Sequence, residues 1–443
     1  MLKKLLLIAL VPLIILSVFS GCGKKSSDKD TEGDIDLTEK SIEFAREMAG
    51  GSFENTVEAF DSTMKSALTA EQLSQAWSET VSNIGNFKSV YDSEYESSAS
   101  GRQVSVILEY ELSGLKVLFS YDNTGKINGL WITYHNIPAQ EDNPAGNIEI
   151  EIGNDPYKLS GILRMPTENS VNPPVVILVH GSGSSDYDET IGANKPFKDL
   201  ADGLSQKGIA TLRYNKRFYQ YPQSAAESIT IQDEVIDDVN SAIEFVKGRE
   251  ELKGSKIYIL GHSMGGMLAP YIASINPEVA GIIIMAGSPR RLEDIILDQN
   301  IAAIDAMADK TEEEKEQLLQ QVREQIDIIK GLTDEDAETV AMGVPASYWL
   351  SLGKIDTPEI CSDLSIPMLI MQGSADFQVL ADVDYKMWQD ILDEKTNVEF
   401  KLYEELNHLF MPTNGKKDIS EYSIKSEVDE QVIWDIAQWI NSR

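Results

Sequence analysis

The sequence predicts an α/β fold for the larger part of this 443-residue chain, preceded by a small α+β domain. From residue 147 onward, short and almost wholly apolar segments alternate with segments of helical periodicity. This alternation is typical of a mostly parallel sheet covered by helices on both faces. Residues 38–138 instead show helical patterns first and alternating strand patterns afterwards, which indicates a separate α+β domain.

The small domain is expected to begin with two helices. Apolar residues recur at helical spacing over 52–68 and again over 69–85. Thr69 and Gln72 have the spacing of a capping box at the start of the second helix. These signals place both helices ahead of the sheet.

Three β-rich segments follow the helices, and residues 122–126 (DNTGK) predict a hairpin turn between the last two. Proline, glycine and acidic residues over 137–147 predict the boundary with the larger domain, which we assign to residues 147–443. The expected strands of the small domain are 102–112, 115–122 and 127–136.

The larger domain is expected to open with an antiparallel pair of strands and to continue with parallel strands joined by helices. An acidic helical stretch, roughly 290–361, interrupts this rhythm and is predicted to be a cap inserted into the sheet domain. The expected strands are 147–153, 158–166, 174–181, 208–214, 256–261, 279–287, 367–373 and 398–405. The expected helices are 196–207, 231–247, one after 265, 381–392 and 426–441.

The charge of the chain excludes one class of partner. Asp and Glu number 72 against 38 Lys and Arg, which gives a net charge of −34. A surface this acidic repels phosphate backbones, so no nucleic-acid partner is expected. The sequence also lacks a Walker pattern, a zinc-ligand cluster and a calcium loop, so neither a cofactor nor a metal is expected.

The N-terminus has the pattern of a targeting segment. Two lysines precede an apolar run, and small residues then lead to Cys22. Residues 1–21 resemble a bacterial lipoprotein signal, and the resemblance implies that a lipid on Cys22 anchors the mature chain to the outer side of the cell membrane. Residues 22–37 are polar and are expected to form a flexible tether. Cys361 is the only other cysteine, so no intramolecular disulfide is expected after lipidation.

The strongest functional motif is Gly261-His262-Ser263-Met264-Gly265, which fits G-x-S-x-G. It follows a predicted strand and precedes a predicted helix, which is the context of a serine nucleophile on a sharp turn. The alternative is a buried strand that ends in a glycine-rich loop. The strand and helix on either side favour Ser263 as a nucleophile.

A serine nucleophile needs a base, and the base needs an acid to orient it. Where this motif occurs, the acid and then the histidine follow the serine along the chain. His408 is the only histidine after Ser263. Asp376 comes directly after a predicted buried strand and is the favoured acid, whereas Asp382 and Asp384 are alternatives at the start of the next helix.

Two backbone N–H groups are expected to stabilise the oxyanion. One is that of Met264, at the start of the helix after the nucleophile. The other is that of Ser182, with Gly181 as the alternative, in the glycine-rich loop after the third strand of the larger domain. A dinucleotide-binding fingerprint is the competing interpretation of this loop, but Asp186 occupies its third glycine position.

Together these motifs resemble the α/β-hydrolase fold, in the group of dienelactone hydrolases and prolyl-oligopeptidase-like esterases. The matching stretches lie in residues 180–217, GHSMGG, QGSADFQV and NHLF. The resemblance implies hydrolysis of a small-molecule carboxylic ester through an acyl-enzyme. A serine peptidase of the same fold and a binding lipoprotein without activity remain as alternatives. Residues 38–138 resemble a domain of unknown function that precedes such hydrolases.

The expected cap leads to a prediction about substrate size. Its acidic helix should face water, and Tyr348 and Trp349 are expected to face the substrate pocket. Such a cap would limit the pocket to small or short acyl groups. The alternative is that these two aromatic residues pack the cap onto the sheet.

Overall fold

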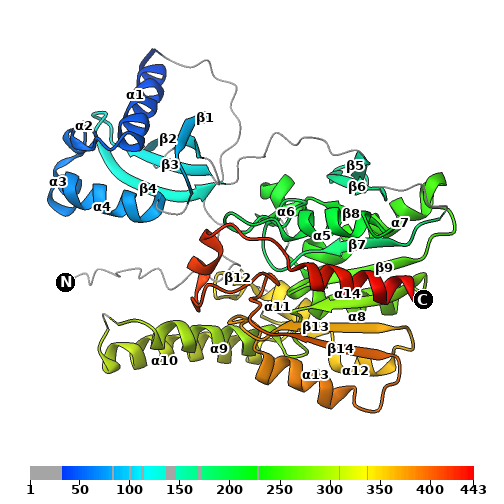
Figure 1. The fold of residues 1–443 in the computed structure, drawn as a ribbon. Coiled ribbons are helices and arrows are strands. Elements are labelled where there is room, and N and C mark those ends of the chain that lie inside the picture. Colours follow the sequence, from blue (N-terminus) through cyan, green and yellow to red (C-terminus); the bar gives the residue numbers. More distant parts are fainter. Residues whose placement is uncertain are drawn as a thin grey trace.

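The computed structural model contains a small N-terminal domain and a larger sheet domain (Figure 1). Residues 1–31 lie outside the described part, so the signal segment 1–21 and Cys22 have no structural account here. The same holds for residues 136–145, which contain most of the predicted boundary segment. The described residues are 32–81, 84–98, 101–110, 114–135, 146–166, 172–226, 229–308, 310–336 and 338–443.

The small domain contains a four-stranded antiparallel sheet in the order β1-β2-β3-β4. Alternate residues of β3 point into the domain core, as period-2 alternation requires. The strands are β1 Phe87–Ser98, β2 Gly101–Tyr110, β3 Gly114–Tyr121 and β4 Ile127–His135. The helices are α1 Glu32–Ala49, α2 Glu54–Glu58, α3 Ser62–Ala67 and α4 Ala70–Val81.

Two local predictions for this domain are confirmed. The Thr69 N–H donates to Gln72 Oε1 at 3.0 Å, and the Gln72 N–H donates to Thr69 Oγ1 at 3.2 Å, which is the reciprocal capping box. The turn between β3 and β4 is held by Asp122, whose carboxylate accepts the N–H groups of Thr124 and Lys126. Local side-chain chemistry decides both features, so the sequence suffices to predict them.

Three other expectations for the small domain are wrong. Helix α1 begins at Glu32, inside the predicted tether 22–37, and buries a stripe that includes Leu37. The single helix expected over 52–68 is two short helices, because Asp61 caps α3 after Phe60 has bridged to Ile127. Strand β1 was not expected because it is a polar edge strand without a clear apolar alternation.

The large sheet has eight strands in the order β14-β13-β10-β9-β7-β8-β6-β5. The pairs β5–β6 and β6–β8 are antiparallel, and the remaining pairs are parallel. All eight predicted strands of the larger domain are therefore present, in an α/β-hydrolase topology. They are β5 Asn147–Ile152, β6 Leu159–Arg164, β7 Val175–Val179, β8 Ala210–Tyr214, β9 Ile257–His262, β10 Val279–Met285, β13 Met368–Gly373 and β14 Val398–Tyr403.

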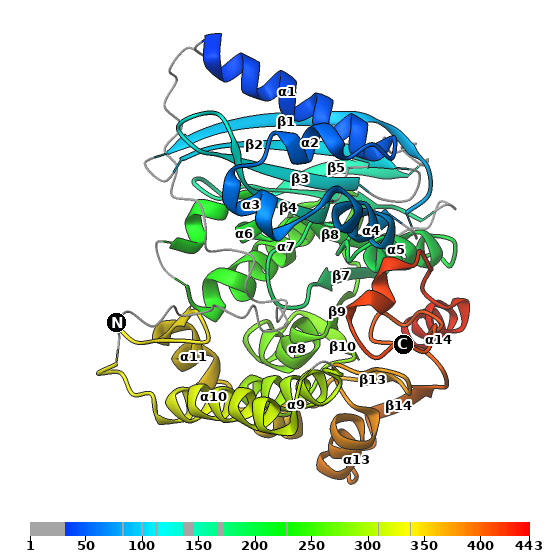
Figure 2. The same cartoon turned by 90° about the vertical axis from the view of Figure 1, so that its left-hand side faces the viewer.

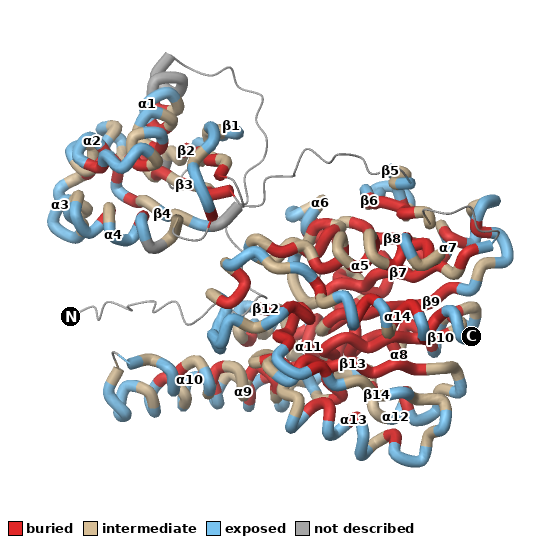
Figure 3. Tube along the Cα trace, viewed as in Figure 1, coloured by how far each residue is buried: buried red, intermediate tan, exposed pale blue. Residues whose placement is uncertain are grey.

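Helices cover both faces of this sheet (Figures 1 and 2). Successive residues of β7 belong to two different apolar clusters, one on each face. Helices α7 and α8 pack into the first cluster, and α5 and α14 into the second. Figure 3 shows the buried residues concentrated along the central strands. The α-helices are α5 Pro196–Ser205, α6 Arg217–Gln220, α7 Asp237–Gly248, α8 Met264–Ile275, α13 Lys386–Ile391 and α14 Glu430–Asn441. Short 3₁₀ or π turns are η1 Pro222–Ala226, η2 Gln232–Ile236, η3 Glu250–Leu252, η4 Ala381–Tyr385 and η5 Ile419–Ser423.

The acidic insertion leaves the sheet after β10 and returns before β13. Its long helix α10 opens with a capping box of Thr311 and Glu314 and buries one apolar stripe, while its other side chains reach solvent (Figure 3). None of the described helices combines the length and the apolar composition needed to cross a bilayer. The insertion comprises α9 Leu292–Asp305, α10 Glu312–Gly331, β11 Val340–Ala341, β12 Val344–Pro345, α11 Ala346–Gly353 and α12 Thr357–Asp363.

Candidate active site

Ser263 stands on the turn between β9 and α8, in a conformation that few residues adopt. Its φ is +54° and its ψ is −115°, which costs about 1–3 kcal/mol in a non-glycine residue. A Cβ at Gly261 would overlap the carbonyl of Gly265, and a Cβ at Gly265 would overlap the carbonyl of Val179. The glycines of the motif are therefore required by the close approach of β9, α8 and β7.

The structure brings His408 and Asp376 together. His408 Nδ1 lies 2.7 Å from Asp376 Oδ2, and both residues are buried. The other carboxylate oxygen, Asp376 Oδ1, accepts the N–H groups of Gln378 at 2.8 Å and Val379 at 3.0 Å. Since a carboxylate can only accept, His408 donates from Nδ1, which leaves Nε2 as the acceptor.

Neither alternative acid occupies this position. Asp384 is buried, but its carboxylate is bound by Arg290 at 2.7 Å and by the Ser288 hydroxyl at 2.5 Å. Asp382 is exposed on the first turn of η4. Asp376 is thus the member of the predicted set that contacts the histidine.

The glycine-rich loop after β7 is fixed through its backbone. The Gly181 N–H donates to Glu189 Oε1 at 2.7 Å, and the Gly181 carbonyl accepts from Lys216 Nζ at 2.7 Å. The Gly183 N–H donates to Glu234 Oε1 at 2.7 Å, and Lys216 Nζ also binds this oxygen at 2.8 Å. Two buried carboxylates therefore hold the loop on either side of Ser182.

This arrangement decides which N–H groups are free to bind a substrate. The Gly181 N–H is already bound by Glu189, so the expectation of Gly181 as an alternative donor is wrong. The Ser182 N–H bonds to no other described residue. Met264 is the first residue of α8, where an N–H has no acceptor within its own helix. A Cβ at Gly181 would lie 3.2 Å from Ser263 Cβ, so the loop passes directly over the nucleophile motif.

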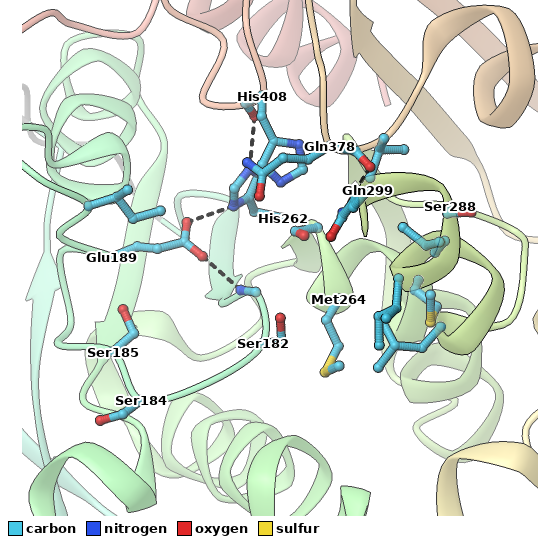
Figure 4. A pocket seen from close by; sticks show the side chains of 18 of the residues that line it. Ser182, Ser184, Ser185, Glu189, His262, Met264, Ser288, Gln299, Gln378 and His408 are labelled. Atoms are coloured by element: carbon cyan, nitrogen blue, oxygen red, sulfur yellow. Dashed lines mark hydrogen bonds and ion pairs between the residues drawn. The ribbon is translucent and has the colours of Figure 1, made fainter. Parts of the chain in front are cut away.

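His262 links this loop to the loop that carries His408. Its Nδ1 lies 3.0 Å from Glu189 Oε2, and its Nε2 lies 2.9 Å from the His408 carbonyl oxygen (Figure 4). Burial disfavours a charge on His262, but the Glu189 carboxylate more than offsets this and raises the pKa of His262. Burial likewise acts against the charge on Glu189, yet His262 lowers the pKa of Glu189 below its usual value. The two residues form a buried ion pair.

Sequence reasoning missed this ion pair. Glu189 lies eight residues after Gly181 with nothing in the local pattern to single it out, although its φ of +52° marks a constrained backbone in the fold. Lys216 and Glu234 were missed for the same reason, because they meet only after the segment that follows β8 has packed against η2.

His180 orders the loop and does not have the environment of a base. It packs against Phe197 with ring centroids 4.8 Å apart, and its Nε2 lies 2.9 Å from the Asp186 carbonyl oxygen. Burial lowers the pKa of His180 to about 4, so the imidazole is neutral. The neutral ring, protonated at Nε2, donates the hydrogen bond to the Asp186 carbonyl.

A cavity of about 260 Å³ opens at this edge of the sheet (Figure 4). Ser263, His408, Met264 and Ser182 all contribute to its wall. The predicted nucleophile, base and two oxyanion donors are therefore gathered around one space. The other lining residues are Gly181, Ser184, Ser185, Glu189, Thr190, Ile191, His262, Met267, Ser288, Leu292, Ile295, Ile296, Gln299, Gln378 and Val379.

The insertion contributes to this wall through α9, not through the aromatic residues that were expected there. Tyr348 is 2% exposed and its hydroxyl contacts Met264 Sδ at 3.5 Å, behind the lining. Trp349 is buried and donates from Nε1 to the Ala341 carbonyl at 3.2 Å. Both belong to the apolar core, so the prediction that Tyr348 and Trp349 line the pocket is wrong. Aromatic content alone did not distinguish a core-facing helix from a cavity-facing one.

The lining is nearly free of unpaired charge. Among the described residues that line the cavity, Glu189 supplies the only carboxylate, and no lysine or arginine is present.

In the described part of the chain, no three His, Cys, Asp or Glu side chains are grouped so that they could hold a metal ion. Cys361 is buried, and burial raises the pKa of its thiol to about 12, so it is not a reactive thiol.

Comparison with known proteins fits this geometry. The family model described as serine aminopeptidase, S33, matches residues 173–413, more than half of the chain. The chain belongs to this family. A second model, a protein of unknown function (DUF3887), matches residues 41–130 of the small domain.

Esterase EstD of Thermotoga maritima is 32% identical over 404 residues, which cover 90% of this chain and 93% of that protein. The family member described here is therefore a hydrolase of the carboxylesterase type. Among solved structures, Est1E from Butyrivibrio proteoclasticus is 16% identical, with a TM-score of 0.44, and covers 66% of this chain and 98% of its own. Dienelactone hydrolase from Anabaena variabilis is 17% identical, with a TM-score of 0.38, and covers 67% and 97%.

Proposed function

We propose that this hydrolase cleaves carboxylic esters of small or short acyl groups through an acyl-enzyme on Ser263. The observation that carries the proposal is the single cavity that joins Ser263 to His408, with His408 held by Asp376 at 2.7 Å. In this arrangement His408 is the base, and Asp376 fixes its tautomer and stabilises its protonated form.

The reaction proceeds in two halves. Ser263 Oγ attacks the acyl carbon while His408 Nε2 takes the serine proton, and the same proton then passes to the leaving alcohol. Water next attacks the acyl-enzyme with His408 again as the base, which releases the carboxylic acid and restores Ser263. The negative oxygen formed in each half is bound by the N–H groups of Met264 and Ser182.

The buried carboxylates behind the loop support this role for Ser182. They bind the N–H groups on both sides of it and leave the Ser182 N–H for the oxyanion. Donors that are already fixed need no reorganisation when charge develops in the transition state.

Ester cleavage is favoured over the alternative aminopeptidase activity by the charge of the lining. An aminopeptidase must bind an α-ammonium group, and an unpaired carboxylate is the natural partner for such a cation. Glu189, the carboxylate in the described lining, is already bound by His262 and Gly181. Matched p-nitrophenyl butyrate and butyryl p-nitroanilide, together with aminoacyl anilides, test this choice. Faster cleavage of the aminoacyl anilides would favour the peptidase.

A serine-directed phosphonate tests the mechanism itself. We expect one phosphonyl group per chain, located on Ser263 by peptide mass spectrometry, and loss of ester turnover in step with labelling. Turnover that persists after complete labelling would exclude this mechanism. No labelling of Ser263 together with no turnover of any ester would instead favour the alternative of a binding lipoprotein without activity.

We also propose that the enzyme is anchored by lipid on Cys22 to the outer side of the cell membrane. The support comes from the signal-like residues 1–21, which lie outside the described part of the chain. Cys22→Ser should remove the protein from the membrane fraction while the esterase activity of the released protein stays unchanged. A native protein found wholly in the cytoplasm would contradict this proposal.

A further inference from the structure

The cavity has an apolar interior and a polar mouth. Its five purely apolar side chains on α8 and α9 are all less than 10% exposed, namely Met264, Met267, Leu292, Ile295 and Ile296. Among its polar side chains, Ser182, Gln299 and Gln378 are half-buried and Ser184 is exposed, whereas Glu189, His262, Ser288 and His408 are buried and already hydrogen-bonded or ion-paired within the protein. An ester that enters the cavity therefore places its apolar end inside and its polar end at the mouth.

The glutamines at the mouth present hydrogen-bond acceptors. Gln299 Nε2 donates to the backbone carbonyl of Gln378 at 3.0 Å, and Gln378 Nε2 donates to the Tyr422 hydroxyl at 2.6 Å. Each of these bonds uses one of the two N–H groups of its amide nitrogen, and each side-chain carbonyl oxygen accepts from no other described residue, so both glutamines offer an acceptor and a second donor. In Figure 4 Gln299 and Gln378 lie on one side of Ser182, and Ser184 and Ser185 on the other. A ligand with several hydroxyl donors satisfies this set.

The mouth also discriminates against charge. The described lining contains no lysine or arginine that could neutralise an anionic alcohol, and Glu189 is already paired and cannot bind a cation. The net charge of −34 further disfavours anionic substrates. The apolar interior offers buried apolar side chains and the Ser288 hydroxyl, which already donates to Asp384, so a carboxylate there would lose its hydration without a partner.

We infer that the substrate is a neutral, short-chain acyl ester of a polyhydroxylated alcohol such as a sugar. This inference rests on the proposed esterase function. It assigns the acyl group to the apolar interior of the cavity and the alcohol to the polar mouth. Water supplies the atoms that replace the cleaved acyl–oxygen bond, so the products are the free sugar and a short carboxylic acid.

Two esters of matched shape provide the test. Methyl 6-O-butyryl-glucopyranoside and cyclohexylmethyl butyrate share the acyl group, a primary ester and a six-membered ring, and differ in the oxygen groups of that ring, namely three hydroxyls, the ring oxygen and a methoxy group. With two or more hydrogen bonds at the mouth, we expect kcat/KM to be about 10-fold higher for the sugar ester. The corresponding 6-O-succinyl sugar ester, with a free carboxylate, should be cleaved about 100-fold more slowly than the butyryl ester.

Variants locate the preference in the mouth. Gln299→Leu should lower the sugar-to-cyclohexyl ratio of kcat/KM about 5-fold, and Ser184→Ala about 3-fold, because each removes one hydrogen-bonding group. Gln320→Leu, on the exposed surface of α10, is the matched control and should leave the ratio unchanged.

A ratio near one in the native enzyme, or a ratio that neither mouth variant changes, would overturn the inference. Ser263→Ala is assayed in parallel with p-nitrophenyl butyrate. If that activity depends on Ser263 while the sugar preference is absent, only the substrate class is wrong. If it does not depend on Ser263, the proposed function itself fails.

Discussion

The loop after β7 and helix α9 form opposite parts of the same cavity, and they are built in different ways. The loop is held by buried charges, with Glu189 and Glu234 binding its N–H groups. Helix α9 contributes mainly apolar side chains that are held by packing, with Gln299 as its polar residue at the mouth. The loop is therefore fixed in position, as charge stabilisation requires, whereas α9 sets the shape of the apolar interior and one side of the mouth.

This contrast separates residues needed for reaction from residues that choose the substrate. Changes that free the loop backbone from its buried carboxylates should reduce kcat for every ester. Changes on α9 should alter the relative rates of different esters. Four measurements examine this separation.

Removal of the nucleophile should have the largest effect. Ser263→Ala should lower kcat for p-nitrophenyl butyrate by about 10³–10⁶-fold, because serine, base and acid act as one unit. Near-normal turnover by this variant, once contaminating native enzyme is excluded, would show that the reaction uses another group.

Breaking the buried ion pair should come next. Glu189→Gln leaves His262 without its anion and loosens Gly181, so we expect kcat to fall about 10–100-fold for short and long esters alike. The free energy of unfolding should fall by about 3 kcal/mol, as for other buried pairs that lose one partner. Urea titration and steady-state kinetics measure the two effects.

Asp390→Asn is the matched control for this variant. It breaks the exposed pair of Lys386 and Asp390, which is worth about 0.3–0.5 kcal/mol at most. A Glu189→Gln variant that behaves like this control in both assays would mean that the loop does not depend on the ion pair.

Shortening the α9 wall should have a smaller and selective effect. Ile295→Ala enlarges the apolar interior, so the ratio of kcat/KM for hexanoate over butyrate esters should rise about 5-fold. Ile304→Ala is the control, since Ile304 is equally buried on the same helix but does not line the cavity. If the two variants have the same hexanoate-to-butyrate ratio, the α9 side chains that line the cavity do not determine which acyl chain is preferred.

The pH dependence of stability should show the smallest effect. Because the folded-state pKa of His262 is raised, its contribution is complete below the unfolded value of about 6.5 and is lost as pH rises through the folded value. The pKa of Glu189 is lowered, so its contribution is lost as pH falls through that lower value. The stability difference between the native protein and His262→Gln should therefore shrink as pH rises above about 6.5. A difference that grows at high pH would contradict the ion pair.

The sequence was sufficient where the determining contacts are local or follow from strand order. Ser263, Asp376 and His408 each come at or just after the end of a strand of the sheet, and the parallel strands carry all three to one edge. The partnership of Glu189 with His262 depends on how a loop folds back over β9, so no spacing predicts it. Tyr348 and Ile295 are both apolar positions on insertion helices, and only the packing of those helices determines which one faces the cavity.

The place where the insertion joins the sheet has a consequence for the evolution of this enzyme. Strands β10 and β13 are parallel neighbours, so the segment between them leaves the sheet at the carboxyl edge, where the cavity opens, and crosses back to the opposite edge to enter β13. Such a segment can be lengthened, shortened or exchanged as a cassette without a change in strand order. Descendants of this chain can therefore acquire new substrates by recombination in one continuous stretch of the gene while they inherit the reaction chemistry intact.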